Sequence, residues 1–134
     1  LGLGQLQRYP TILKRRKELI ELYDQGLKGC NVDILEHYGK DFSSNGHLYM
    51  VRLIGKCEEE RNNVITKMAQ KGIATNVHYK PLPMLTAYRK IGFDIKDYPN
   101  AYAQYANEIT LPLRTLLSNE DVKYICENLQ QILN

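Results

Sequence analysis

Apolar residues near the start of the chain recur every seven positions, at Leu6, Leu13, Ile20 and Leu27. This spacing places them on one face of an amphipathic helix. Pro10 lies inside the pattern. Because proline removes one backbone hydrogen bond and clashes with the preceding turn, we expect a kink or a restart of the helix there. A glycine at position 26 or 29 then ends the helix. Residues 1–29 are therefore predicted to form a long helix, which either packs on its own sheet or bridges to another domain.

The rest of the chain alternates between strand-like and helix-like patterns. Strands are predicted at 47–54, 73–77 and 108–113, with a weaker one at 32–35, and helices at 58–71, 83–90, 100–107 and 119–133. Few strands, with helices long enough to cover one face, indicate an α+β fold: a two-layer sandwich with a small three- to four-stranded sheet and helices packed on one face. The strand pairing is either antiparallel or mixed. The length fits one domain, 1–134, in which an interdomain-type helix (1–29) precedes a sheet-and-helix body (30–134).

Composition narrows the possible function classes. The formal net charge is only +3 and the charges are interleaved, whereas non-specific binding of nucleic acid needs a clustered basic face. The densest basic group, residues 14–17, is interpreted as the solvated side of a helix. Three widely spaced cysteines argue against disulfides or structural zinc, which predicts reduced thiols and a cytoplasmic protein. We find no membrane-spanning run and no signal peptide, and the start at Leu1 suggests either a piece of a longer protein or an N-terminus that this sequence leaves out.

Two polar rings, His78 and Tyr79, stand where a predicted strand meets a proline-stiffened loop. Loops at the ends of strands often hold groups that contact a ligand. Adjacent strand residues point to opposite faces, so both rings can reach one ligand only where the strand has ended, which Pro81 favours. The residues alone leave a second interpretation open, in which His78 bonds a backbone carbonyl and Tyr79 packs. Lys80 is interpreted as solvated rather than as a Schiff-base lysine.

Other polar residues receive structural interpretations. Arg52, inside an apolar strand, is expected to be a paired edge residue rather than a contact to a ligand carboxylate or phosphate. Arg61 is expected to pair with neighbouring glutamates. His37 and His47 have no partner at metal-ligand spacing and are interpreted as surface histidines. No metal site is predicted, and without a phosphate loop or a nucleophile pair the chain resembles part of an active site rather than a whole one.

The order of several motifs resembles that of the DegT/StrS family, the pyridoxal-phosphate-dependent sugar aminotransferases of fold type I. The matching segments are L-G-x-x-Q-L at 1–6, Arg16, 47–53, Arg61-Asn62, Gly72-Ile73 with His78-Tyr79-Lys80-Pro81-Leu82, Tyr88-Arg89, and 111–113. The similarity covers essentially the whole chain and lies in the order and spacing of the motifs. Two positions depart from the pattern: Pro83 replaces a usual histidine, whose substrate contact is then absent, and Pro10 interrupts a helix that is normally continuous.

The resemblance implies the C-terminal, smaller domain of a longer enzyme. In that family the large domain carries the catalytic lysine, so this chain alone is expected to be inactive, with no catalytic residue and no bound pyridoxal 5'-phosphate. The full-length enzyme would use pyridoxal 5'-phosphate to move an amino group, typically from glutamate, to a nucleotide-linked keto-sugar. The family also suggests a homodimer. His78 and Tyr79 would line the substrate cleft, which the resemblance favours over the packing interpretation.

Three alternatives accompany this hypothesis. The chain can be a non-catalytic binding or dimerisation module of the same fold. It can also belong to a pyridoxal-phosphate-dependent sugar dehydratase, because that choice rests on the lysine outside this chain. A small RNA-binding α+β domain is the third, although the predicted strands show no interleaving of aromatic and basic residues.

Overall fold

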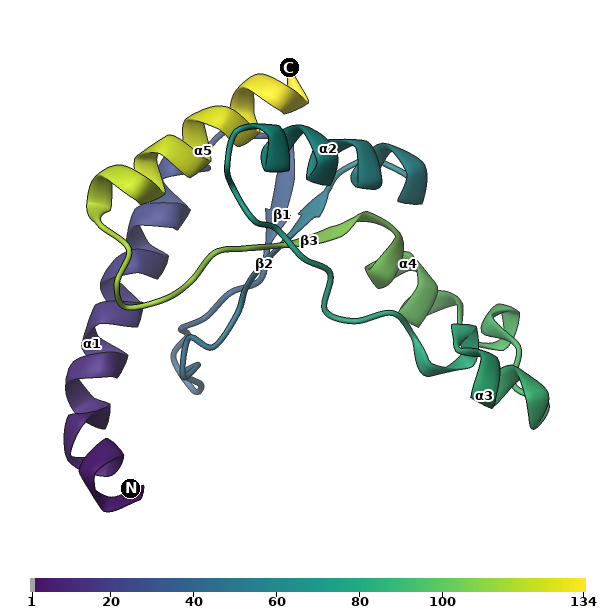
Figure 1. Cartoon of the computed structure of the whole chain (residues 1–134), viewed down its shortest axis with the longest axis horizontal. Coiled ribbons are helices and arrows are strands. Elements are labelled where there is room, and N and C mark those ends of the chain that lie inside the picture. Colours follow the sequence, from purple (N-terminus) through teal and green to yellow (C-terminus); the bar gives the residue numbers. More distant parts are fainter. Residues whose placement is uncertain (1) are drawn as a thin grey trace.

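The computed structural model describes residues 2–134, which form helices around a small sheet (Figure 1). The elements in chain order are α1 (Gly2–Gly26), β1 (Val32–Ile34), β2 (Tyr49–Leu53), α2 (Glu58–Gln70), the 3-10 turn η1 (Leu82–Met84), α3 (Thr86–Lys90), the 3-10 turn η2 (Ile95–Asp97), α4 (Pro99–Asn107), β3 (Glu108–Leu111) and α5 (Asn119–Leu133). Within residues 2–134, no helix combines the length and apolar character needed to cross a membrane.

The sheet has three strands in the order β1-β2-β3, and both pairs are antiparallel. The central strand β2 sets the register, because Arg52 lies opposite Asp33 on one side and opposite Glu108 on the other. Opposed residues of an antiparallel pair place their side chains on the same face. The predicted small sheet is therefore confirmed, and its pairing is antiparallel rather than mixed.

One face of the sheet carries the hydrophobic core. Tyr49, Val51 and Leu53 of β2 alternate toward this face and are fully buried. Helices α1, α2 and α5 cover it, as Figure 1 shows, and contribute the other core residues. The buried helical side chains include Leu19, Ile20 and Tyr23 of α1, Val64 and Met68 of α2, and Val122, Ile125 and Leu129 of α5. The predicted two-layer arrangement, with helices on one face, is confirmed.

The C-terminal half of α1 packs closely on α5. A Cβ atom added at Gly26 would lie 2.7 Å from the Cys126 sulfur, so only glycine permits this approach. The Gly26 carbonyl also accepts a hydrogen bond from the Gln130 side chain at 2.8 Å. Burial raises the pKa of the Cys126 thiol to about 12, so this packed thiol is protonated at neutral pH. The N-terminal part of α1, residues 2–11, is exposed and extends past the sheet (Figure 1).

Of the kink or restart expected at Pro10, the restart is wrong. The helix is a single 25-residue element with Pro10 inside it. Proline removes the one backbone bond that would reach the Leu6 carbonyl. Leu6 is 65% exposed, so water can donate a hydrogen bond to its carbonyl in place of the missing backbone N–H. The helix therefore tolerates Pro10.

The predicted strand at 73–77 is also wrong. It is replaced by a single bridge, in which the amides of Asn76 and Thr110 each donate to the other's carbonyl at 3.2 and 2.7 Å. The Asn76 side chain accepts a bond from the Val77 amide at 2.8 Å, a local turn that competes with strand pairing. The segment therefore crosses β3 instead of running along it (Figure 1).

The short helices form an arm that projects from the body (Figure 1). The helix predicted at 83–90 is divided into the η1 turn and α3, while the helix predicted from residue 100 is α4. Three aromatic rings hold the arm together: the Phe93 centroid lies 5.9 Å from that of Tyr88 and 6.3 Å from that of Tyr98.

His37 is buried, so its interpretation as a surface histidine is wrong. Its ring stacks on Tyr49 with centroids 5.6 Å apart, and Tyr49 stacks on Tyr23 at 4.5 Å. Both ring nitrogens of His37 are buried without a hydrogen-bond partner among the described residues. Burial lowers the pKa of His37, against a smaller opposing effect of Asp24. The ring is thus held neutral.

We expect His37 to make folding pH-dependent. Since its folded pKa lies below the unfolded value of about 6.5, the unfolded chain takes up the proton first. The contribution of His37 to the free energy of unfolding is therefore fully present above about pH 6.5 and is lost as the pH falls below that value. His37→Phe keeps an aromatic ring in the stack but removes the titrating group. The free energy of unfolding, measured with urea, should then fall less between pH 7.5 and pH 5 than it does in the wild type. The exposed control His47→Gln should keep it; an unchanged slope in His37→Phe would contradict this account.

Candidate functional site

The segment after Gly72 brings His78 against β3, on the face of the sheet away from the core. In β3 the residues alternate, so Ile109 and Leu111 enter the core while Glu108 and Thr110 face the other way. His78 lies over these two polar residues. In the described residues no strand directly precedes His78, so the predicted strand end is absent and an irregular segment carries the ring.

A continuous chain of hydrogen bonds joins Glu108, Thr110 and His78. The Thr110 hydroxyl donates to Glu108 Oε1 at 2.6 Å, and the Thr110 oxygen lies 2.8 Å from His78 Nδ1. The second carboxylate oxygen of Glu108 accepts the backbone N–H of His78 at 2.9 Å. One carboxylate thus holds both the ring and the main chain of His78. The alternative in which His78 bonds a backbone carbonyl is wrong, because its ring partner is a hydroxyl.

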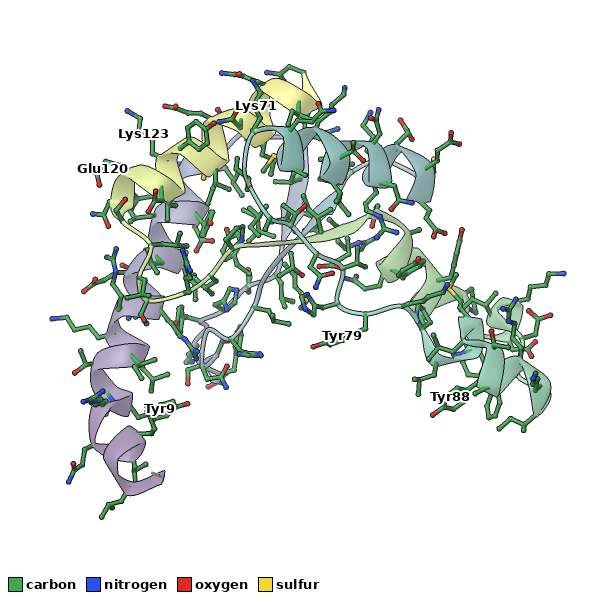
Figure 2. The ribbon with its side chains drawn as sticks, in the orientation of Figure 1. Tyr9, Lys71, Tyr79, Tyr88, Glu120 and Lys123 are labelled. Carbon is green, nitrogen blue, oxygen red and sulfur yellow. The ribbon has the colours of Figure 1, made fainter. Side chains whose placement is uncertain are left out.

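Tyr79 follows directly and is 71% exposed. The peptide bond between His78 and Tyr79 is cis, and the two rings meet edge to face with centroids 4.6 Å apart. Figure 2 shows Tyr79 on the side of the sheet opposite Lys71, Glu120 and Lys123, which mark the helical layer. The two predicted site residues are therefore in contact with each other. Their role toward a substrate stays a prediction.

A row of charged residues crosses the same face of the sheet. Arg52 lies between its register partners Asp33 and Glu108. Its guanidinium approaches Asp33 at 3.9 Å and donates to the Asn107 side chain at 3.1 Å. The expectation that Arg52 is paired is confirmed, but its expected edge position is wrong, because β2 is the central strand. This face is polar where the opposite face is apolar, so it is suited to polar contacts.

Arg61 anchors the start of β3. It is 1% exposed, and its Nη1 donates to the carbonyls of Tyr105 and Glu108 at 2.9 and 3.0 Å. The guanidinium also lies over the Tyr105 ring at 4.8 Å, a cation–π contact. Of the neighbouring glutamates only Glu58 approaches, at 3.9 Å, so the expected glutamate pairing is a minor part of its role. Arg61 ties α2 to the junction of α4 and β3, and thereby holds the backbone that carries Glu108.

Glu108 and Thr110 were not among the residues that the sequence singled out. Both are buried, at 1% and 6% exposure. The signal was present in the strict alternation of polar and apolar residues at 108–111, which places a carboxylate and a hydroxyl on one face. What the sequence lacked was the crossing segment that brings His78 onto that face.

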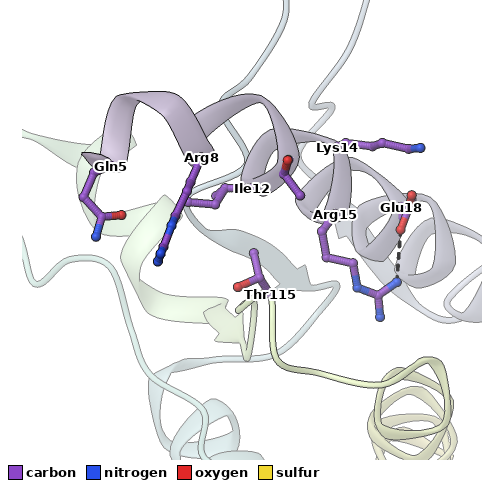
Figure 3. A pocket seen from close by; sticks show the side chains of 8 residues that line it. Gln5, Arg8, Ile12, Lys14, Arg15, Glu18 and Thr115 are labelled. Atoms are coloured by element: carbon purple, nitrogen blue, oxygen red, sulfur yellow. Dashed lines mark hydrogen bonds and ion pairs between the residues drawn. The ribbon is translucent and has the colours of Figure 1, made fainter. Parts of the chain in front are cut away.

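A separate hollow lies along α1, away from His78 and Tyr79. Its lining comes from α1 and the loop before α5: Gln5, Arg8, Thr11, Ile12, Lys14, Arg15, Glu18 and Thr115 (Figure 3). Arg15 binds Glu18 at 3.2 Å, the Leu117 carbonyl at 2.6 Å and the Asn119 side chain at 3.0 Å. This basic residue is therefore structural. The expectation of a solvated basic face at 14–17 fails at Arg15, and in part at Arg16, whose Nε is buried.

The described residues do not supply the environment that a cofactor-binding lysine needs. Such a lysine requires a desolvated pocket, whereas every lysine of residues 2–134 is exposed except Lys56, which is half-buried and bonded to Glu60 at 3.2 Å. Nor do residues 2–134 contain a group of three or more His, Cys, Asp or Glu side chains placed to hold a metal ion.

Comparison with known proteins places the chain in a family. The sequence profile of the DegT/DnrJ/EryC1/StrS aminotransferase family matches residues 1–130. The chain belongs to this family. The resemblance read from the motifs is confirmed.

Relatives of this DegT-family chain agree in fold. A putative sugar aminotransferase of Streptococcus pneumoniae, solved in its PMP form, is 51% identical, with a TM-score of 0.97 over 98% of this chain and 33% of that one. Helicobacter pylori PseC, an aminotransferase of pseudaminic acid biosynthesis, is 27% identical, with a TM-score of 0.85 over 98% and 35%. A Campylobacter jejuni transaminase for UDP-4-amino-4,6-dideoxy-N-acetyl-beta-L-altrosamine is 28% identical over 99% of this chain and 35% of its own length. The chain spans about a third of the length of these relatives.

We expect Arg61→Met to destabilise the fold by roughly 2–4 kcal/mol, because one buried and one part-buried carbonyl lose this donor. Urea unfolding followed by circular dichroism measures this. Arg8→Met, on the exposed part of α1, should change stability by less than about 0.5 kcal/mol. Equal effects of the two substitutions would contradict the anchoring role of Arg61.

Proposed function

We propose that this chain is the C-terminal domain of a pyridoxal-phosphate-dependent aminotransferase that acts on nucleotide-linked keto-sugars. The observation that carries the proposal is the match of the chain, over nearly its whole length, to one third of a sugar aminotransferase at 51% identity. Several curated relatives are named for amino-sugar synthesis, including a GDP-perosamine synthase of Escherichia coli at 28% identity. In this proposal the product serves polysaccharide or other amino-sugar biosynthesis in the cytoplasm.

Within the longer enzyme, this domain closes one side of the substrate cleft. The polar face of the sheet supports this role, because it combines anchored groups with the exposed ring of Tyr79. His78 and Tyr79 are the proposed substrate contacts. Tyrosine suits such a position, since its ring covers apolar sugar carbons while its hydroxyl bonds polar groups.

The cofactor is proposed to be held outside this chain. Pyridoxal 5'-phosphate, when bound, supplies the electron sink for amino-group transfer. The exposed lysines of residues 2–134 do not fit the reactive position, so we derive no step through the cofactor from these residues. The domain alone is proposed to be inactive. Glutamate as amino donor and a homodimeric assembly complete the proposal for the full-length enzyme.

The activity can be tested directly with the full-length enzyme. Given 15N-glutamate and a nucleotide-linked keto-sugar, it should produce a 15N-amino sugar, detectable by mass spectrometry. Transfer of label to the sugar supports the proposal. Loss of a sugar hydroxyl without incorporation of nitrogen would instead identify a dehydratase. If neither reaction occurs with a panel of nucleotide-linked keto-sugars, the result would support a non-catalytic module.

The site residues are tested by Tyr79→Phe and His78→Gln in the full-length enzyme. Loss of one substrate hydrogen bond should raise KM for the nucleotide sugar about tenfold. The cofactor absorbance and KM for glutamate should stay unchanged, as should all values in the control His47→Gln. Unchanged KM for the nucleotide sugar in both site variants would remove His78 and Tyr79 from the cleft.

A further inference from the structure

Hydrogen bonds join Glu108, Thr110 and His78. The direction of each bond, that is, which atom donates and which accepts, decides what the free nitrogen of His78 can bind. We propose that Glu108 and Thr110 are positioning residues that hold the neutral His78 ring with its proton on Nδ1, so that Nε2 accepts a hydrogen bond from a donor group on the sugar. The part concerning the sugar rests on the proposed function. The part concerning the proton does not.

The direction follows from counting protons. An ionised carboxylate only accepts hydrogen bonds, and a threonine hydroxyl has one proton to give. The Thr110 hydroxyl gives its proton to Glu108 Oε1 at 2.6 Å. The Thr110 oxygen is then an acceptor toward His78 Nδ1 at 2.8 Å, so that nitrogen carries a proton. The other ring nitrogen, Nε2, keeps its lone pair in the neutral ring.

Because Glu108 and Thr110 are buried, water does not compete for the hydrogen bonds between them and His78. Glu108 is 1% exposed and Thr110 is 6% exposed. Both oxygens of Glu108 are occupied, one by the Thr110 hydroxyl and one by the His78 backbone amide. Arg61 bonds the Glu108 carbonyl and the Asn76 bridge bonds the Thr110 backbone, so the two positioning residues are held from both sides. Hydrogen bonds of this kind, in a region of low dielectric constant, set geometry firmly.

The free end of the ring determines the ligand chemistry. His78 Nε2 has no hydrogen-bond partner among residues 2–134, yet it is not one of the buried unpartnered nitrogens, so it reaches solvent. A lone pair there is satisfied by a hydroxyl, amide or amino group, all of which donate. The oxygens of an ionised diphosphate can only accept. His78 thus fits a donor group rather than a diphosphate oxygen, and on the proposed function we assign that donor to the keto-sugar part of the substrate, so the diphosphate must be bound by other residues.

The proton position is measurable in the 15N-histidine-labelled chain, which has three histidines. At a pH where His78 is neutral, its ring-nitrogen shifts should report a proton on Nδ1, with the signal assigned by its loss in His78→Gln. Thr110→Val removes the acceptor and should move the proton toward Nε2, while Thr110→Ser keeps the hydroxyl and should restore it. The distant control Thr66→Val should leave His78 unchanged.

Glu108→Gln gives a sharper outcome. The amide oxygen is needed to accept the His78 backbone N–H, so the amide nitrogen turns toward Thr110 and donates to it. The Thr110 hydroxyl must then donate to His78 Nδ1, and the ring proton should move to Nε2. A wild-type proton on Nε2 would overturn the proposal. The proposal would also be overturned if the proton stays on Nδ1 in both Thr110→Val and Glu108→Gln while the amide spectra show that these variants are folded.

The sugar contact is tested separately in the full-length enzyme. Thr110→Val and Glu108→Gln should raise KM for the nucleotide sugar about tenfold, and Thr110→Ser should recover most of this. The Kd of the free nucleoside diphosphate should not change, because it lacks the keto-sugar attached to the diphosphate. If the NMR result holds but KM is unaltered while label transfer proceeds, the positioning stands and the sugar contact is refuted. Absence of any transfer refutes the proposed function and leaves the NMR result intact.

Discussion

The antiparallel pairing of β2 with β3 is the interaction on which the other features depend. It gives the sheet two unlike faces, since side chains alternate along a strand. Tyr49, Val51 and Ile109 point to the helical side, where they are fully buried. On the other face, Arg52 and Glu108 are register partners. A slip of one residue would exchange these sets, placing a carboxylate in the core and a core side chain at the site.

The buried polar residues around this sheet connect stability to function. Arg61 bonds the carbonyls at the α4–β3 junction, and Glu108 at that junction bonds His78. The same strand that closes the core therefore supports the proposed substrate contact. Hydrogen-bonded side chains with little exposure are well suited to hold a binding group at a defined position.

The sequence predicted the elements whose pattern is local. The amphipathic stripe of α5 and its Ser118 cap are present, with Ser118 and Asp121 each accepting the other's backbone N–H at 3.0 and 2.8 Å. The family resemblance likewise depended on local motifs and was confirmed. The predictions were wrong where contacts between residues far apart in the sequence determine the local structure. Residues 73–77 have strand-like composition, but the Asn76 turn leaves one bridge to Thr110. His37 reads as a polar surface residue, yet its ring stacks in the core on Tyr49.

The central claim is that the polar face of this sheet, through His78, contacts the sugar of a nucleotide-linked substrate. A crystal structure of the full-length enzyme with a nucleotide-linked amino sugar bound would test it most directly. The account predicts a sugar hydroxyl, amide or amino group about 2.7–3.2 Å from His78 Nε2. A sugar bound beyond contact with this face, or a diphosphate oxygen placed against the neutral Nε2, would contradict it.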